Sequence, residues 1–382
     1  MELRRAWEAS TAFLRSLTRR YYESNSPLLP SDFPLREFAA QLWGSKSYVR
    51  HMSFTRRSDV QSFLARKAPR HFYYSSARYE QPGVDDMDAK GWRSADITFD
   101  IDADHLVECR DKVFTLESPF EGKTSLVPDE CLKPAARQAR LLVDILVEEL
   151  GFEERRISVE FSGNRGFHVT VLLPDGDERA RSGSEYRREL VNYIKALGLS
   201  VETVEPWRTL GRKSTLQPVP PQAWMAGLRG RVARIAAKLA GGRDPDLVKV
   251  FLRADPLTAA ALYEARRGDI EDILARAMEL VGVEVDEQVT VDTRRLVRAP
   301  LSVNGKTGLV VKPVKLEELE SFELGEELSA FQGEPARVRL VVDLPRIRVI
   351  GYTLRLRAGE TPRLPLPLAG YLMARGLAVL VR

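Results

Sequence analysis

The segment Ser94 to His105, SADITFDIDADH, carries four aspartates at alternating positions. Apolar residues fill the positions between them, and this period of two predicts a β-strand that covers a core with one face. The aspartates then share the other face, with Asp100 and Asp102 about 7 Å apart at Cα. Two carboxylates at that spacing can bind one divalent cation or two neighbouring ones, and Mg²⁺ and Mn²⁺ prefer such oxygen ligands.

An acidic strand is not by itself a metal site. A lone Asp-x-Asp pair is far more often the solvated edge of a sheet than a pair of ligands. Without a cation, the neighbouring charges repel, and the pKa of at least one carboxyl rises. The assignment of Asp100 and Asp102 as metal ligands therefore depends on what other segments bring to the same place.

A second candidate segment, residues 156–173, reads RISVEFSGNRGFHVTVLL and predicts two strands joined by a tight turn. In such a hairpin, Ser162 and His168 share one face near the tip. Arg165 offers a planar pair of donors suited to phosphate oxygens, and the flanking glycines allow a ligand to approach the backbone. The segment favours a triphosphate-binding turn, although an ordinary hairpin would need the same glycines.

A third segment, residues 283–308, combines acids with a run of cations: VEVDEQVTVDTRRLVRAPLSVNGKTG. A carboxylate from Asp286 or Asp292 would complete a three-acid metal site beside the aspartate strand. Arg298 and Lys306 would hold phosphates that the metals bridge. Alternatively, Asp292 is a helix N-cap and the arginines form a solvated helix face.

Several elements must position these segments. Periodicity predicts helices over residues 3–22, near 36–43 and over 134–151, and a final helix and strand within 367–381. From about residue 176 to 282 the patterns are helical, with a proline-rich loop at 216–224. We therefore expect an α/β fold. Its discontinuous core covers residues 1–175 and 283–382, and a mostly helical insertion covers 176–282.

The composition limits the class of protein. The chain has 382 residues, of which 44% are hydrophobic and 29% charged, as expected for a globular protein with a real core. The net charge of +4 permits a nucleic-acid partner without requiring one. The N-terminal segment is too charged for a secretory signal, and no apolar run is long enough to span a membrane. Two cysteines imply no disulfide framework and a reducing, cytoplasmic setting.

In this order, the three segments resemble the catalytic small subunit of archaeal and eukaryotic DNA primases, most closely the archaeal form. Further similar stretches are YVRHMSF, the residues before the aspartate strand, PRHFYYSSARYEQPGVDDMDAKGW, and the C-terminal AGYLMARGLAVL. The resemblance covers roughly residues 37–172 and 284–382, and the helical middle matches weakly. Three motifs in order are far more specific than one. The resemblance implies a primase-type catalytic core of mixed β-sheets flanked by helices.

The resemblance also implies roles for individual residues. Catalytic metals would be bound by Asp100, Asp102 and Asp286, with Asp292 as the alternative third acid. The phosphates of the incoming nucleotide would contact Ser162, Arg165, His168, Arg298, Ser302 and Lys306. Arg50 is a weaker candidate for the same pocket.

Two departures from the family pattern matter. Asn304 stands where the family often has histidine, and an amide can donate a hydrogen bond to phosphate but carries no charge. We expect a weakened contact there. Pro128 replaces a cysteine of the family's zinc knuckle, which leaves Cys109 and Cys131, with His105 as a further candidate ligand. Because structural zinc needs four N or S ligands, we expect two ordinary thiols and no tightly held structural zinc.

The implied activity is synthesis of short primers on single-stranded DNA from nucleoside triphosphates, by nucleotidyl transfer with two Mg²⁺ or Mn²⁺ ions. The implied partner is a primase large subunit in a heterodimer, and the implied location is the cytoplasm, at the nucleoid. Three alternatives stay open: a repair or translesion polymerase of the same superfamily, a metal-dependent nuclease or phosphohydrolase, and a non-catalytic DNA-binding subunit. The last would leave the acids unexplained.

Overall fold

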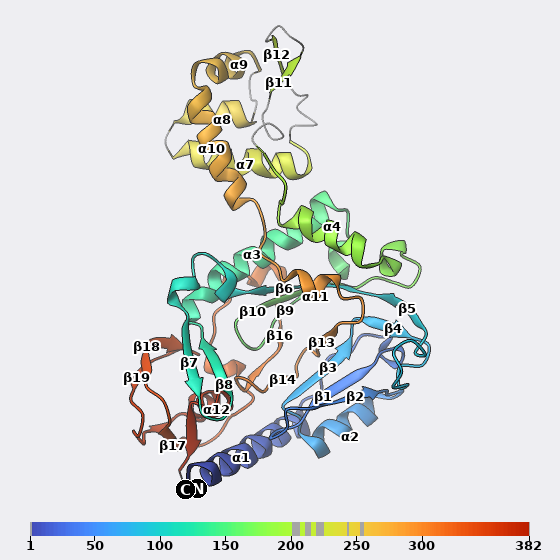
Figure 1. Cartoon of the computed structure of the whole chain (residues 1–382), viewed down its shortest axis with the longest axis vertical. Coiled ribbons are helices and arrows are strands. Elements are labelled where there is room, and N and C mark those ends of the chain that lie inside the picture. The colour runs from blue at the N-terminus through green and yellow to red at the C-terminus, as the bar shows by residue number, and fades with distance from the viewer. Residues whose placement is uncertain are drawn as a thin grey trace. The chain divides into compact units, whose positions relative to one another are not determined.

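The computed structural model describes residues 2–200, 207–210, 215–218, 225–242, 244–252 and 256–381 (Figure 1). The chain divides into two compact units. The first comprises Met1–Arg140, Arg155–Arg187 and Asp286–Arg382, and the second comprises Leu141–Glu154 and Arg188–Val285. The predicted α/β class is confirmed, and every strand pairing among the described residues is antiparallel.

One four-stranded sheet of the first unit has the order β13-β3-β1-β2. Its strands are β1 (Phe38–Gln41), β2 (Tyr48–Met52), β3 (His71–Ser75) and β13 (Leu296–Arg298). The prediction of a short helix near residues 36–43 is therefore wrong. β1 pairs with a strand on each side, and the Phe38 ring stacks on Phe72 at 5.6 Å between ring centroids. Non-local pairing and packing outweigh the local helical pattern.

The other four-stranded sheet has the order β16-β9-β10-β6. Its strands are β6 (Ile97–Asp102), β9 (Ile157–Phe161), β10 (Gly166–Val171) and β16 (Lys312–Pro313). The predicted aspartate strand and hairpin are confirmed. In the β6–β10 register, Asp100 lies opposite His168 and Asp102 opposite Gly166. A Cβ atom at residue 166 would lie 1.8 Å from the carbonyl oxygen of Ile101, so this close pairing requires glycine.

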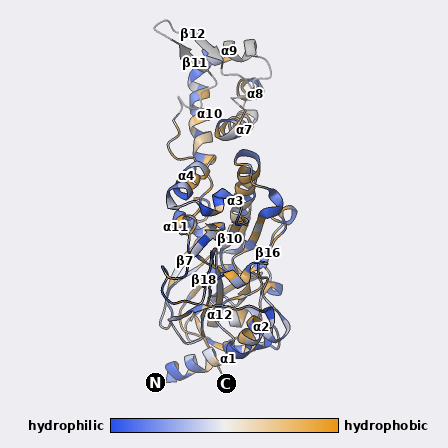
Figure 2. Ribbon diagram, turned by 90° about the vertical axis from the view of Figure 1, so that its right-hand side faces the viewer, coloured by the Kyte–Doolittle hydropathy of each residue, from blue (hydrophilic) through white to orange (hydrophobic). Residues whose placement is uncertain are grey.

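Helices and shorter strands surround the two sheets. The helices are α1 (Glu2–Ser24), α2 (Arg57–Lys67), α3 (Leu132–Asp144), α11 (Glu287–Val291) and α12 (Leu366–Ala374). The strands are β4 (Ala77–Tyr79), β5 (Trp92–Ala95), β7 (Phe114–Ser118), β8 (Gly122–Leu126), β14 (Val303–Asn304), β15 (Leu309–Val310), β17 (Ala336–Leu340), β18 (Leu344–Val349), β19 (Tyr352–Leu356), β20 (Arg363–Leu364) and β21 (Ala378–Leu380). The helix expected over 134–151 continues from α3 into a π-helical turn at Ile145–Glu149. All of α12 is buried, in keeping with its apolar sequence (Figure 2).

The second unit is built mainly from helices around their own apolar cluster. It contains β11 (Trp207–Leu210), β12 (Thr215–Pro218), α7 (Gly227–Gly241), α8 (Pro245–Leu252), α9 (Pro256–Ala265), α10 (Arg267–Leu280) and the end of α4 (Ser184–Ile194). Val232, Phe251 and Leu274 are fully buried in the cluster. The proline-rich loop predicted at 216–224 lies mostly outside the described residues.

Asp96, the first of the four aspartates, belongs to a buried ion network. It is 1% exposed, and its carboxylate accepts hydrogen bonds at 2.7 Å from both Arg36 and Arg78 and at 3.0 Å from the backbone N–H of Leu173. Two guanidinium groups and one amide therefore hold this carboxylate. Asp96 stabilises the start of β6 and takes no part in the acidic cluster farther along the strand.

Cys109 and Cys131 form a disulfide, with their Cα atoms 5.8 Å apart. The expectation of two ordinary thiols is therefore wrong. The chain folds back after β6, so that Cys109 lies beside the residue that precedes α3, and both side chains are buried. A disulfide leaves neither sulfur as a thiolate for zinc. A separation of 22 residues in the sequence does not reveal this approach.

Each helix in the described part of the chain is too short or too polar to cross a membrane.

Replacing Asp96 with Asn should destabilise the fold. The change removes one of the two carboxylates that the buried guanidinium groups of Arg36 and Arg78 share, and leaves them with Asp32. Removal of one partner of a buried ion pair costs up to about 3–5 kcal/mol of unfolding free energy. Urea unfolding of the two proteins checks this value. Asp59→Asn, at a partly exposed position in the first turn of α2, is the control. An Asp96→Asn protein as stable as the control would contradict the assignment.

Glu160 should make stability depend on pH. Burial raises the pKa of this β9 carboxyl to about 7, and a hydrogen bond with Ser158 opposes the rise only in part. A raised folded-state pKa means that stability is greatest at low pH and falls until the folded carboxyl has ionised.

The Glu160→Gln variant lacks this ionisation. Its unfolding free energy relative to the wild type should therefore rise by on the order of 2 kcal/mol between pH 5 and pH 8. Urea titrations at both pH values measure the difference, in which other titrating groups cancel. An unchanged difference would show that Glu160 is not buried as an acid.

Candidate active site

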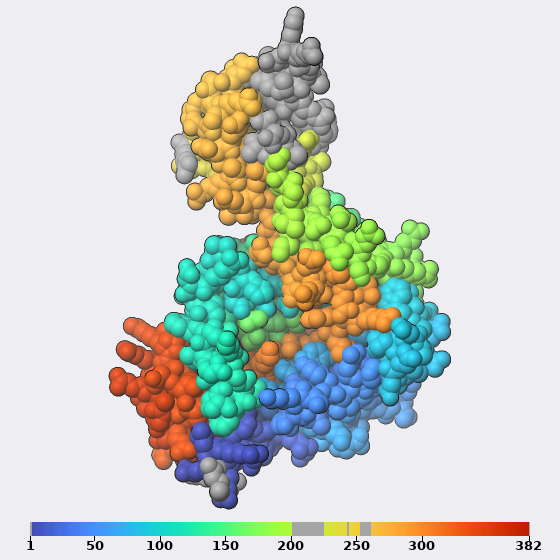
Figure 3. All heavy atoms as spheres, viewed as in Figure 1, coloured from blue at the N-terminus to red at the C-terminus, as the bar shows by residue number. Residues whose placement is uncertain are grey.

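A cavity of about 470 Å³ lies between the two sheets of the first unit. One wall comes from β6, β10 and the turn between β9 and β10, and the other from β2, β3, β13 and the loop at residues 304–306. The surface of the molecule is hollowed between the β7–β8 hairpin and the N-terminal strands (Figure 3). The three segments predicted to carry chemistry thus meet around one cavity.

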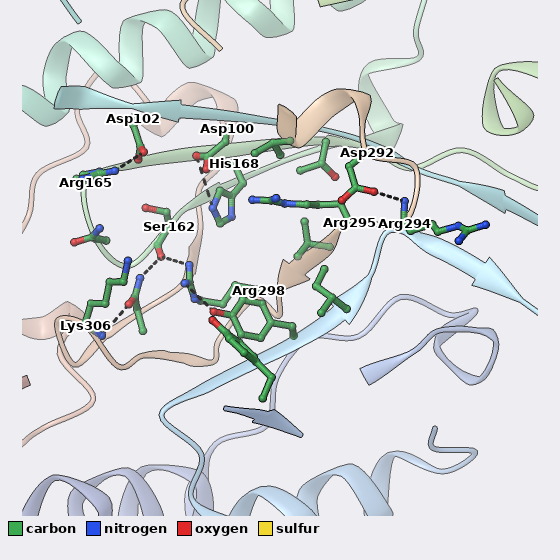
Figure 4. A pocket seen from close by; sticks show the side chains of 18 of the residues that line it. Asp100, Asp102, Ser162, Arg165, His168, Asp292, Arg294, Arg295, Arg298 and Lys306 are labelled. Atoms are coloured by element: carbon green, nitrogen blue, oxygen red, sulfur yellow. Dashed lines mark hydrogen bonds and ion pairs between the residues drawn. The ribbon is translucent and has the colours of Figure 1, made fainter. Parts of the chain in front are cut away.

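Asp100 and Asp102 line this cavity from neighbouring outward positions of β6 (Figure 4). Burial raises the pKa of Asp100 to about 7, and the carboxylates of Asp102 and Asp286 add to the rise. Its Oδ1 atom is buried and has no hydrogen-bond partner among the described residues. Burial would also raise the pKa of Asp102, but the Arg165 guanidinium, 2.8 Å away, holds it below its usual value.

The third segment reaches β6 through its backbone. The N–H of Asp286 donates to the carbonyl oxygen of Asp100 at 3.0 Å, and α11 begins at the next residue. Asp286 rather than Asp292 is the N-cap, since its carboxylate accepts from the N–H of Gln288 at 2.9 Å. Asp292 lies at the other end of α11, is exposed, and lines the cavity. Asp286 is thus close enough to Asp100 to raise its pKa but lies outside the cavity lining, whereas Asp292 is part of the lining.

Among the described residues, one group of three potential metal ligands lies closer together than the predicted set of Asp100, Asp102 and Asp286. Ligand atoms of Asp102, Asp104 and His105 lie within 4.8 Å of one another. Arg165 bridges the two aspartates of the group at 2.8 Å each, so these carboxylates are already neutralised in part. Asp100 and Asp286 do not belong to this group.

His168 stands directly across from Asp100 in the β6–β10 ladder, with Nε2 3.9 Å from Oδ1. Burial lowers the pKa of His168 to about 4, and the nearby Arg298 contributes to the shift. The imidazole is therefore neutral at physiological pH and can donate one hydrogen bond without adding charge.

Ser162 lies at the tip of the hairpin and lines the cavity. Its hydroxyl is buried without a hydrogen-bond partner among the described residues. Its carbonyl oxygen accepts from Arg298 at 3.5 Å and from the Asn304 amide at 3.0 Å. Asn304, the residue that departs from the family pattern, therefore fastens the hairpin to the 304–306 loop as well as lining the cavity.

Cations crowd the wall opposite the aspartates. Desolvation lowers the pKa of Lys306, and Arg298, Arg165, Arg375 and Arg70 lower it further. The Arg298 guanidinium lies 5.3 Å from the centroid of the Tyr73 ring, and its Nε atom has no hydrogen-bond partner among the described residues. Such a cluster of like charges is stabilised by an anion.

Of the two remaining candidates for phosphate contacts, Ser302 lies outside the cavity lining and Arg50 lies within it. Ser302 is fully buried outside the cavity lining, 3.5 Å from the carbonyl oxygen of Phe72, so its position does not support a phosphate contact. The fold of the residues before β14 turns this side chain towards β3. Arg50 does line the cavity, and the buried carboxylate of Glu37 holds its guanidinium at 3.0 Å.

The sequence patterns did not predict the tyrosines that line the cavity, or one of its arginines. Tyr48 and Tyr73 line the cavity with ring centroids 5.9 Å apart, and Arg295 also lines it and lowers the pKa of His168. The residues around Tyr73 appeared only as a stretch similar to the family. The alternation in HFYYS predicts that the side chains of Tyr73 and Phe72 point to opposite faces of β3. It does not predict that a cavity lies beside Tyr73.

The arrangement separates opposite charges across one cavity. The carboxylates of Asp100 and Asp102 on β6 can bind divalent cations, and the arginines and lysine opposite can bind a phosphate chain. Nucleotidyl transfer needs both features at once, because the metals must contact the phosphates that the cations hold.

Comparison with known proteins identifies the family that the three segments resemble. The family model described as DNA primase small subunit matches residues 99–316. The DNA primase small subunit PriS of Hyperthermus butylicus is 54% identical over 374 residues, which is 97% of each chain. The proteins of that name from Aeropyrum pernix and Sulfolobus acidocaldarius are 36% and 30% identical, over 95% and 100% of this chain and 91% and 98% of theirs. The chain belongs to the DNA primase small-subunit family.

Proposed function

We propose that this chain synthesises short primers on single-stranded DNA by template-directed nucleotidyl transfer at the cavity. The observation that carries the proposal is the placement of Asp100 and Asp102 on one wall and of Arg298 and Lys306 on the other. Membership of the primase family supplies the reaction class.

The acidic wall fits divalent cations. The Asp100 Oδ1 atom is buried without a hydrogen-bond partner among the described residues. Burial and the neighbouring Asp102 carboxylate raise the pKa of Asp100 to about 7, and a bound cation would favour its ionised form. We assign the metals to Asp100, Asp102 and Asp286, with Asp292 as the alternative third ligand. Bound Mg²⁺ or Mn²⁺ would activate the attacking 3′-hydroxyl and stabilise the departing pyrophosphate.

The protein's own residues orient the nucleotide. Arg165, His168 and the Ser162 hydroxyl contact the phosphates from the hairpin side. Arg298 and Lys306 contact them from the opposite wall, where they neutralise the charge that grows on the leaving group. Arg165 also keeps Asp102 ionised, so that one residue serves both the acids and the phosphates.

The cation cluster favours this function over a metal-dependent nuclease or phosphohydrolase. A hydrolase would use the same carboxylates but has no need to hold a triphosphate, whereas Arg298, Lys306 and Arg165 surround space for one. A repair or translesion polymerase of the same superfamily would share the cavity. It would extend an existing primer without starting a new one.

The partners and the location follow from the family. Relatives are named small subunits, so we infer a primase large subunit in a heterodimer, a single-stranded DNA template, and action in the cytoplasm at the nucleoid. We also propose that residues 1–175 and 283–382 form the catalytic core and that residues 176–282 are an insertion that varies without changing the chemistry.

Asp100→Asn should lower primer synthesis at least about a thousandfold, because loss of a metal ligand removes several kcal/mol of transition-state stabilisation. The assay follows labelled nucleotides incorporated on unprimed single-stranded DNA, with pyrophosphate release as a second readout. Asp59→Asn is the control. Near-normal synthesis by Asp100→Asn, with a far-ultraviolet spectrum like the wild type, would refute the assignment.

The wild-type protein also distinguishes the competing functions in this assay. A primase produces new chains together with pyrophosphate. Extension that requires an added primer would indicate a repair polymerase instead, and release of orthophosphate or cleavage of the template would indicate a hydrolase or nuclease.

Two substitutions separate the candidates for the third acid. Asp286→Asn should reduce synthesis about as much as Asp100→Asn, because it removes a proposed metal ligand whose charge already acts on Asp100. Asp292→Asn should keep at least about a third of wild-type activity, as expected for an exposed residue outside the ligand set. The opposite ranking in the same primer assay would transfer the role to Asp292.

A further inference from the structure

A second, smaller cavity of about 140 Å³ adjoins the nucleotide cavity. The two cavities share Asn164, Arg165 and Lys306 in their linings. The remaining lining comes from β8, from the residues just before it, from Arg70, and from Ala374 and Arg375 at the end of α12. This recess therefore lies beyond the cationic side of the nucleotide cavity.

The recess carries a large excess of positive charge. Its cations are Arg70, Lys123, Arg165, Lys306 and Arg375, and its single acid is Glu121. Glu121 forms a two-point ion pair with Arg70. Arg165 is paired with Asp102 and Asp104. Within the described part of the chain, Lys123, Lys306 and Arg375 have no acidic partner at ion-pair distance. The recess thus holds cations that an anion would stabilise.

Arg375 is held in place as a ligand-binding arginine would be. It is 5% exposed and lies over the Tyr371 ring, 4.6 Å from the ring centroid. It donates at 2.7 Å to the carbonyl oxygen of Ser125 and at 2.7 Å to the Asn164 side chain. Its Nε atom is buried with no partner among the described residues. A fixed, desolvated guanidinium with a free donor is suited to bind phosphate oxygens.

The size of the recess restricts its occupant. Sites for whole small molecules are about 300–1,000 Å³, so this recess is too small for a nucleoside. It is large enough for one or two phosphate groups. Because it opens beside Lys306 and Arg165, the occupant can be continuous with a phosphate chain in the larger cavity.

We propose that the recess is a phosphate subsite, which binds the terminal phosphate of the incoming nucleotide and then retains the pyrophosphate product. The inference rests on the proposed function. During transfer, the 3′-oxygen forms a bond to the α-phosphorus and loses its proton to solvent. The bond from the α-phosphorus to the bridging oxygen breaks, and its electron pair leaves with pyrophosphate. Arg375 and Lys123 hold this dianionic or more highly charged product, whereas the carboxylates do not contact it.

Direct binding tests the subsite without catalysis. Calorimetric titration of the full-length chain with pyrophosphate in a chelator should show binding that Arg375→Ala weakens about tenfold, the effect of one charge-assisted hydrogen bond. Lys123→Glu, at an exposed strand position that tolerates change, should weaken binding at least as much. Arg355→Ala, an exposed arginine on β19, is the matched control. Equal pyrophosphate affinity in all four proteins overturns the proposal.

Steady-state extension of a primer with a 5′-hydroxyl gives the second readout. Arg375→Ala and Lys123→Glu should raise the inhibition constant of pyrophosphate about tenfold and raise KM for the nucleotide, with a smaller change in kcat. A defect confined to starting new chains would place the 5′-triphosphate of the first nucleotide in the recess and would overturn the assignment to the incoming nucleotide.

The primer assay and the pyrophosphate titration distinguish failure of the proposed function from failure of the phosphate subsite. If the wild-type chain makes no primers but binds pyrophosphate in a manner that depends on Arg375, the proposed function fails and the phosphate subsite stands. If the chain makes primers and its affinity for pyrophosphate does not depend on Arg375 or Lys123, the subsite fails and the proposed function stands.

Discussion

The antiparallel pairing of β6 with β10 is the constraint on which the site depends. It sets Asp100 opposite His168 and Asp102 opposite Gly166, so that the acids and the hairpin tip share one face of the sheet. A shift of one residue would turn the aspartates to the other face and bury them in the core. Apolar residues at Ile97, Phe99 and Ile101, all fully buried, prevent that shift. The packing of the core therefore decides where the chemistry lies.

The second organising feature is the separation of charge across the cavity. Burial and neighbouring acids raise the pKa of Asp100, and burial and neighbouring cations lower the pKa of Lys306. Each shift shows a charge that the protein alone does not fully stabilise. Metals on one side and phosphates on the other would relieve both, and each would also attract the other. The same reasoning applies beyond Lys306 to the recess around Arg375, where five cations face the single acid Glu121.

Local patterns in the sequence predicted much of this arrangement. Alternation identified β6 and the β9–β10 hairpin, and helical periodicity identified α1 and α12, because these elements follow their own apolar spacing. The helical pattern at residues 36–43 gave a wrong prediction, since β1 is held in place by pairing with β2 and with the more distant β3. Three motifs in order were sufficient to indicate the family and a common site.

The features that the sequence did not reveal depend on contacts between segments that lie far apart in the chain. Asp96 follows the alternation of the acidic strand, yet Arg36 and Arg78 reach it from elsewhere and make it structural. The disulfide, the burial of Ser302 and the placement of Tyr73 likewise arise where segments far apart in the chain meet. Spacing along the sequence does not specify those meetings.

The most direct test of the central claim is anomalous diffraction from crystals of the chain soaked with Mn²⁺ and a non-hydrolysable nucleoside triphosphate. The account predicts manganese density bound to Asp100 and Asp102, with the triphosphate extending towards Lys306. Manganese bound only by Asp104 and His105, or a triphosphate held away from Arg298 and Lys306, would contradict it.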